Sequence, residues 1–232
     1  MKSTPAEPAL QTVRIWDLPT RLFHWLLALT VVASVASGLS GGGAMVWHTR
    51  LGLVVLALLL FRLVWGFMGG HWSRFGSFLY GPRSVAAYWR GDLGPGGRYD
   101  IGHSPVGALS VWALLGLLAV QVATGLVADD EIATTGPLNR FVSSALANAA
   151  SAWHAQLGKT VLIVLIVAHT GAVLYYLWRR RRNLIGPMIH GDMRLATGAV
   201  ASKDGAGLRL AALAVAAAAA AVAWWVGSLG SP

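Results

Sequence analysis

The chain alternates long apolar blocks with shorter polar segments. Five blocks approach the roughly 20 mostly apolar residues that a helix needs to cross a bilayer. They cover residues 22–38, 47–68, 105–127, 151–178 and 208–229. The first block is slightly short, and the last is rich in alanine and only moderately hydrophobic. The pattern predicts an all-α membrane protein with five transmembrane helices.

The polar segments between the blocks differ in character. A glycine-rich turn occupies residues 40–43, a long loop covers 69–104, and a loop that begins with acidic residues covers 128–150. Within the long loop, residues 82–90 can form a short helix that begins at its proline. Its tyrosine and tryptophan favour a position on the membrane surface.

Composition agrees with the membrane class. Hydrophobic residues make up 56% of the 232 residues and charged residues 12%, with a mean hydropathy of +0.60; soluble domains carry about 25% charged residues. The net charge is +9. The cations flank the apolar blocks and form no single patch, which excludes a nucleic-acid-binding protein.

The cations also predict an orientation. With a cytoplasmic N-terminus, fifteen Lys and Arg residues lie inside and only Arg50, Arg140 and Lys159 lie outside. This bias follows the positive-inside rule. We therefore expect a periplasmic C-terminus. Residues 1–13 lack an apolar core, so we expect the first span itself to act as the targeting signal.

The chain has no cysteine. This excludes covalently attached c-type haem, thiolate-bound iron–sulfur clusters and disulfides within the chain. A redox cofactor would have to be held through histidine, methionine or oxygen.

Four of the seven histidines lie in or at the ends of predicted spans, where ionisable residues suggest function. His48 and His154 lie at the outer starts of the second and fourth spans. His24 lies near the inner end of the first span, and His169 follows His154 by about 22 Å of helix. The depths give two pairs, His48/His154 outside and His24/His169 inside. Each pair could supply both axial ligands of a haem iron.

Both outer histidines belong to the same short pattern, H-x-x-L-G, which ends at Gly52 and Gly158. A glycine at i+4 shares a helix face with the histidine and leaves a flat recess. A porphyrin ring could lie in such a recess. The alternative is that these glycines only allow close helix packing.

Haem propionates would need cations. Arg50 and Lys159 lie beside the outer histidines, and Arg62 and Arg21 lie at inner depth. Arg50 and Lys159 are equally well explained as interfacial anchors. We interpret Arg62 as a side chain that snorkels to the surface in preference to one that binds a propionate.

The three remaining histidines, His71, His103 and His190, lie in inner loops or at their edges. We interpret them as solvated or interfacial, with His103 as a spare inner ligand.

At several of these residues the chain resembles the bacterial cytochrome b561 family, which includes the cytochrome b subunits of nickel–iron hydrogenases. The similarity extends over residues 14–193. It includes RIWDLPTRLFHW at 14–25, WHTRLG at 47–52, GHSPVGAL at 102–109, WHAQLG at 153–158, VAHTGAVLYYLW at 167–178 and NLIGPMIHGDM at 183–193.

The resemblance implies a four-helix transmembrane bundle that binds two b-type haems in the bacterial inner membrane. His24 and His169 would ligate the cytoplasmic haem, and His48 and His154 the periplasmic haem. The implied organisation is a tail at 1–13, a di-haem domain at 14–193, a linker at 194–207 and an additional helix at 208–229.

The resemblance also implies electron transfer between quinone and a periplasmic redox partner, either a c-type cytochrome or a dehydrogenase or hydrogenase. A bound quinone is a further implied ligand, with Trp16, Asp17 and Arg21 at the inner edge as candidates for its site. The acidic residues Asp129, Asp130 and Glu131 could attract a basic partner.

Three alternatives stay open. The protein could be a haem-dependent quinone or superoxide oxidoreductase, a histidine-relay transporter without haem, or a non-redox membrane anchor of a larger complex.

Overall fold

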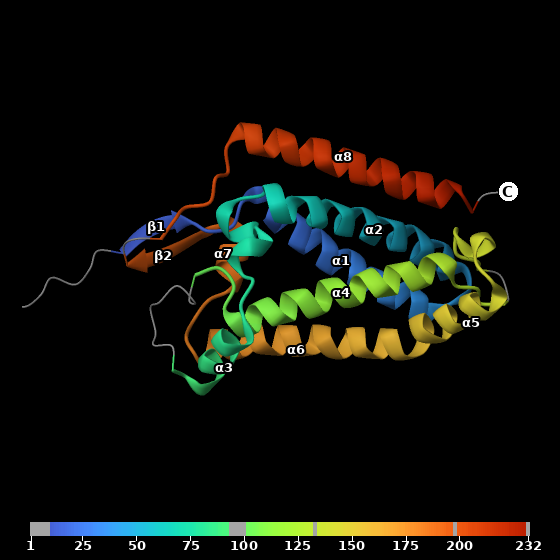
Figure 1. Cartoon of the computed structure of the whole chain (residues 1–232), viewed down its shortest axis with the longest axis horizontal. Coiled ribbons are helices and arrows are strands. Elements are labelled where there is room, and N and C mark those ends of the chain that lie inside the picture. The colour runs from blue at the N-terminus through green and yellow to red at the C-terminus, as the bar shows by residue number, and fades with distance from the viewer. Residues whose placement is uncertain (1–9, 93–100, 132–133, 197–198, 231–232) are drawn as a thin grey trace, which may run out of the picture.

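Five long helices dominate the computed structural model, which describes residues 10–92, 101–131, 134–196 and 199–230 (Figure 1). The helices are α1 (Leu18–Ser40), α2 (Met45–Met68), α4 (Pro105–Val127), α6 (Lys159–Trp178) and α8 (Ala206–Ser228). All five, α6 together with the helical turns before it, are long and apolar enough to cross a membrane. The predicted all-α membrane architecture is therefore confirmed.

Helix α1 begins four residues earlier than its apolar block. The Asp17 side chain caps its N-terminus by accepting a hydrogen bond from Thr20 N, and Pro19 lies in the first turn. Helix α4 begins in the same way, because Ser104 accepts from Gly107 N and Pro105 is the first helical residue. Helix α4 thus begins at the predicted residue, whereas the capped first turn of α1 precedes its apolar block.

The fourth span is longer than predicted. Helix α5 (Ser144–Ala152), a π-helical turn (Trp153–Gly158) and α6 follow one another without a break. The predicted short helix is present as α3 (Pro82–Arg90), and Gly91 ends it in the left-handed conformation. A hydrogen bond of 3.0 Å between the hydroxyls of Tyr88 and Tyr176 joins α3 to α6.

A two-stranded antiparallel sheet lies at the end of the bundle that contains the first turn of α1. Strand β1 (Leu10–Arg14) pairs with β2 (Asp192–Ala196), which follows the short helix α7 (Ile185–His190) (Figure 1). The sequence predicted a tail at 1–13 and a linker at 194–207, so each strand crosses a predicted boundary of the di-haem domain. An isolated pair of five-residue strands gives a weak pattern, because the apolar residues that pack inward, Val13, Met193 and Leu195, are too few to show a period.

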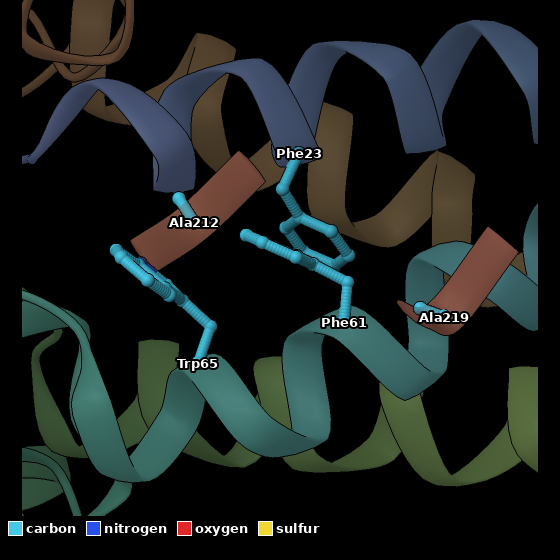
Figure 2. Close-up of a cluster of buried hydrophobic side chains, with 5 residues drawn as sticks. All are labelled: Phe23, Phe61, Trp65, Ala212 and Ala219. Atoms are coloured by element: carbon cyan, nitrogen blue, oxygen red, sulfur yellow. The ribbon is translucent and has the colours of Figure 1, made fainter. Parts of the chain in front are cut away.

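Helix α8 packs along α2, on the outside of the other four long helices (Figure 1). The contact buries Phe23, Phe61 and Trp65 beside Ala212 and Ala219 (Figure 2). Small alanine side chains on α8 let this helix pack closely against its neighbours. The aromatic rings of α1 and α2 fill the space beside these alanines. The alanine-rich composition of α8 therefore matches a packed helix.

Asp204 fixes the start of α8 to the N-terminal segment. Its carboxylate forms ion pairs with Arg14 at 2.7 Å and Arg209 at 3.1 Å, and it accepts a hydrogen bond from Leu18 N. Burial alone would raise the pKa of Asp204. The hydrogen bonds from Arg209 and Leu18 N and the charges of Arg209 and Arg14 outweigh burial and hold this pKa below its ordinary value.

Asp17 is fully buried and joins three segments of this region. One carboxylate oxygen accepts from Thr20 N at 2.8 Å and from Trp65 Nε1 at 3.0 Å. The other accepts from Gly70 N at 3.1 Å and from the Ser73 hydroxyl. These four donors satisfy the buried carboxylate, and they fix α1 to the end of α2 and the loop behind it.

Replacing Asp17 by alanine should lower the free energy of unfolding by about 3 kcal/mol, because it leaves buried donors without an acceptor and removes a helix cap. The measurement is the thermal unfolding midpoint of the purified protein in detergent. Asp92→Ala is the matched control, since the one side-chain contact of Asp92 within the described residues is an exposed ion pair with Arg90. Equal midpoints for the two variants would refute the role of Asp17.

Candidate functional site

The outer histidines meet between α2 and the π-helical turn. The Nε2 atoms of His48 and His154 lie 3.5 Å apart, and the ring planes are inclined at 81°. Each Nδ1 lies 2.8 Å from a main-chain oxygen, His48 from Ser34 O in α1 and His154 from Gln121 O in α4. The pair predicted from depth is thus brought together in space.

These hydrogen bonds determine the tautomers. A carbonyl oxygen can only accept, so both Nδ1 atoms carry the proton and both Nε2 atoms present lone pairs. Two lone pairs that face each other attract a cation placed between them. An imidazole nitrogen binds a first-row metal such as zinc at about 2.0–2.1 Å, so two nitrogens this close can share one metal ion with little adjustment.

Two glycines leave room for the outer rings. A Cβ atom on Gly38 of α1 would lie 2.9 Å from His48 Nδ1, and one on Gly125 of α4 would lie 2.8 Å from His154 Cε1. Gly52 faces open space, whereas Gly158 lies against Gln121 and Trp153. Gly38 lies outside the sequence pattern that Gly52 and Gly158 share, so no sequence signal marked it.

A cavity of about 290 Å³ adjoins the outer pair, near the lower end of the range for ligand sites. Its walls are mainly apolar, with Asp129, Asp130 and Lys159 also among the lining residues. Arg50 is not one of them: its guanidinium lies 5.2 Å above the ring of Trp47. Lys159 is therefore the predicted outer cation that reaches the cavity.

The inner pair joins α1 to α6. The ring centroids of His24 and His169 lie 6.5 Å apart, with planes inclined at 52°. His24 Nδ1 is buried and has no hydrogen-bond partner within the part of the chain that the structure describes. The inner rings are brought together like the outer ones, but among the described residues no main-chain acceptor meets His24 Nδ1.

Arg62 is buried near the inner end of α2, with 4% of its surface exposed. Its Nη2 donates to Ser73 O at 3.0 Å, and the guanidinium lies 4.6 Å from the ring of Phe75. Among the described residues, no acceptor meets its buried Nη1. The side chain does not snorkel to the surface, and its Nη1 can still donate a hydrogen bond to an anionic oxygen.

His103 lies between the rings of Trp16 and Phe78, with centroid distances of 4.8 and 4.5 Å. Burial, followed by the neighbouring Arg62, His24 and His169, lowers the pKa of His103 to about 3. The ring is therefore neutral.

The remaining polar candidates at the inner end of the bundle are Arg21, Asp17, His71 and His190. Arg21 donates to Ile189 O, and Asp17 is the buried acceptor described above. His71 is exposed, and His190 accepts a hydrogen bond from Asp192 N.

The arrangement narrows the class of cofactor. The described residues contain no cluster of three or more histidine, aspartate or glutamate side chains suited to a bare metal ion. Two pairs of histidines, each drawn from two apolar helices, instead suit an iron that takes its other ligands from a porphyrin. This combination of bundle and site is that of a membrane-bound b-type cytochrome.

Comparison with known proteins identifies the family. The model of the family described as "Prokaryotic cytochrome b561" matches residues 15–191, so the chain belongs to this family. A probable Ni/Fe-hydrogenase B-type cytochrome subunit of Bradyrhizobium diazoefficiens is 23% identical over 78% of this chain and 85% of its own length. A probable Ni/Fe-hydrogenase 1 B-type cytochrome subunit of Escherichia coli K12 is 20% identical over 82% and 94%. The family implies haem b, and α8 lies beyond the matched residues.

Gly125→Val should displace His154 and lower the haem-to-protein ratio of the purified protein, because the added side chain would occupy the space of the imidazole. Gly116→Val is the matched control on the same helix, since Gly116 faces open space. The ratio comes from a pyridine haemochrome assay. Equal ratios in both variants would show that Gly125 does not make room for a ligand.

Proposed function

We propose that the protein is a di-haem electron carrier that moves electrons between quinone and a redox partner on the outer face of the inner membrane. The observation that supports this proposal most strongly is the outer pair, whose Nε2 atoms converge while both Nδ1 atoms are held by main-chain oxygens. His48 and His154 would hold the outer haem. His24 and His169 would hold the inner haem at the other end of the same helices.

Haem supplies one-electron chemistry when it is bound, and the protein controls how readily it accepts the electron. Hydrogen bonds from Nδ1 to Ser34 O and Gln121 O orient the outer imidazoles and increase their basicity. More basic ligands stabilise ferric iron. His24 Nδ1 has no such bond to any residue that the structure describes. The inner pair would therefore stabilise ferric iron less, so the two haems would have different potentials.

Cations near the haems would neutralise the propionates. Arg62 Nη1 is a buried donor at inner depth, and Lys159 lines the outer cavity. Arg50 and Gly52 also lie in the outer half of α2, where Gly52 lines the cavity and leaves space for a flat ring. Gly158 would contribute indirectly, through its contact with Gln121.

The partner would carry positive charge where it meets the outer cavity, because Asp129 and Asp130 are among the lining residues. A c-type cytochrome with a basic face would fit this surface, as would a basic dehydrogenase or hydrogenase subunit. The distribution of cations supports a cytoplasmic N-terminus and a periplasmic C-terminus.

Reduced-minus-oxidised spectra with a haem-to-protein ratio test the proposal. We expect a b-type spectrum and two haems per chain, and loss of one haem in His48→Ala and of the other in His169→Ala. His71→Ala is the matched control, because His71 is exposed and outside the bundle.

One haem in the wild-type protein would disprove the two-pair assignment. A wild-type protein without haem, purified from a haem-replete host, would refute electron transfer and favour a transporter or an anchor.

A further inference from the structure

The turn that carries His154 is unusual for a transmembrane helix. Residues Trp153–Gly158 form a π-helical turn between two α-helical segments. Such a turn is one residue wider than an α-helical turn and displaces main-chain groups from the regular hydrogen-bond ladder. In an apolar surrounding these groups need another partner. His154 therefore depends on whatever stabilises the wider turn.

Gln121 of α4 supplies that partner. Its side-chain Nε2 donates a hydrogen bond of 3.2 Å to His154 O, while its own main-chain oxygen accepts from His154 Nδ1 at 2.8 Å. One residue thus contacts His154 at both the backbone and the ring. Gln121 is 7% exposed, so no bulk water competes for these bonds.

Gly158 shows how closely this side chain is packed. A Cβ atom on residue 158 would overlap Gln121 Oε1 and would lie 2.6 Å from Trp153 Nε1. Both of these polar atoms are buried, and neither has a partner among the residues that the structure describes. Gln121 Oε1 is an acceptor, Trp153 Nε1 is a donor, and both lie beside Gly158, which has no side chain to separate them. Small side-chain rotations would therefore allow a hydrogen bond between these two atoms.

We infer that Gln121 is a positioning residue for the outer iron ligand. It holds the π-helical turn at His154 O, and the glycine at position 158 leaves the space that its amide requires. The role in haem binding rests on the proposed function, whereas the contact with the turn does not. Loss of the amide would let the turn relax towards an α-helix, which rotates His154 away from His48.

Gln121→Leu in the full-length protein in nanodiscs removes the donor and keeps the size of the side chain. Gln156→Leu is the matched control, because Gln156 lies in the same turn and is exposed. Hydrogen–deuterium exchange of residues 153–159 should be about tenfold faster in Gln121→Leu, as expected for the loss of one buried hydrogen bond. It should be unchanged in Gln156→Leu. Equal exchange in the two variants would overturn the inference, whatever the haem content.

The haem gives the second readout. In Gln121→Leu, the ratio of reduced to oxidised outer haem at fixed potential should rise about tenfold, which is about 59 mV for one electron. A less firmly held imidazole stabilises ferric iron less. The inner haem should not change, and His24→Ala and His48→Ala assign the two signals. Faster exchange with an unaltered outer haem would overturn the positioning role.

A double-mutant cycle tests the contact with Gly158. Gly158→Ala should reduce the outer haem content strongly in the wild-type background and less in the Gln121→Ala background, where the overlap with Gln121 is removed and only the contact with Trp153 remains. Equal costs in both backgrounds would contradict the proposed packing. A wild-type protein without haem would refute the proposed function, while the exchange measurement would still decide whether Gln121 holds the turn.

Discussion

Two hydrogen bonds from imidazole rings to main-chain oxygens hold the outer site together. His48 of α2 donates to Ser34 O in α1, and His154 donates to Gln121 O in α4. Each bond therefore ties a histidine-bearing helix to a neighbour, and the facing Nε2 atoms join the two halves. In lipid, where unpaired polar groups are costly, such bonds fix the helix rotations as well as the tautomers. The glycines at 38 and 125 follow from the same requirement, because the helices must approach closely enough for these bonds to form.

Much of this arrangement can be read from the sequence, because it depends on depth and period. The apolar blocks place the long helices, and counting residues from each block's ends places His24, His48, His154 and His169 at two levels. Depth alone then leaves few ways to pair them. The family resemblance led to the same pairs, and the matched residues 15–191 agree with its extent.

The remainder depends on partners that lie far away in sequence. The sequence suggested Asp17 as a candidate for a quinone site, and nothing in it indicated that donors from α2 and from residues 70–73 bury this carboxylate. Gln121 gave no signal, because one amide in an apolar block shows neither its partner nor the π-helical turn that it contacts. The role of Gly38 becomes visible only in the folded structure, where α1 packs against the ring of His48. The strands β1 and β2 are too short to produce a pattern before they pair.

The sheet sets an order for assembly. Arg14 and Asp192 pair across 178 residues of chain, and α1, α2, α4 and α6 all lie between them. At about 5–20 residues per second, a ribosome needs roughly 9 to 36 s to make that interval. β1 must wait for this time with its edge unpaired. When β2 arrives, every histidine of the two pairs has already been synthesised, whereas α8 has not. Closure of the sheet therefore marks the moment at which the cofactor-binding part of the chain is complete, before the last helix covers α2.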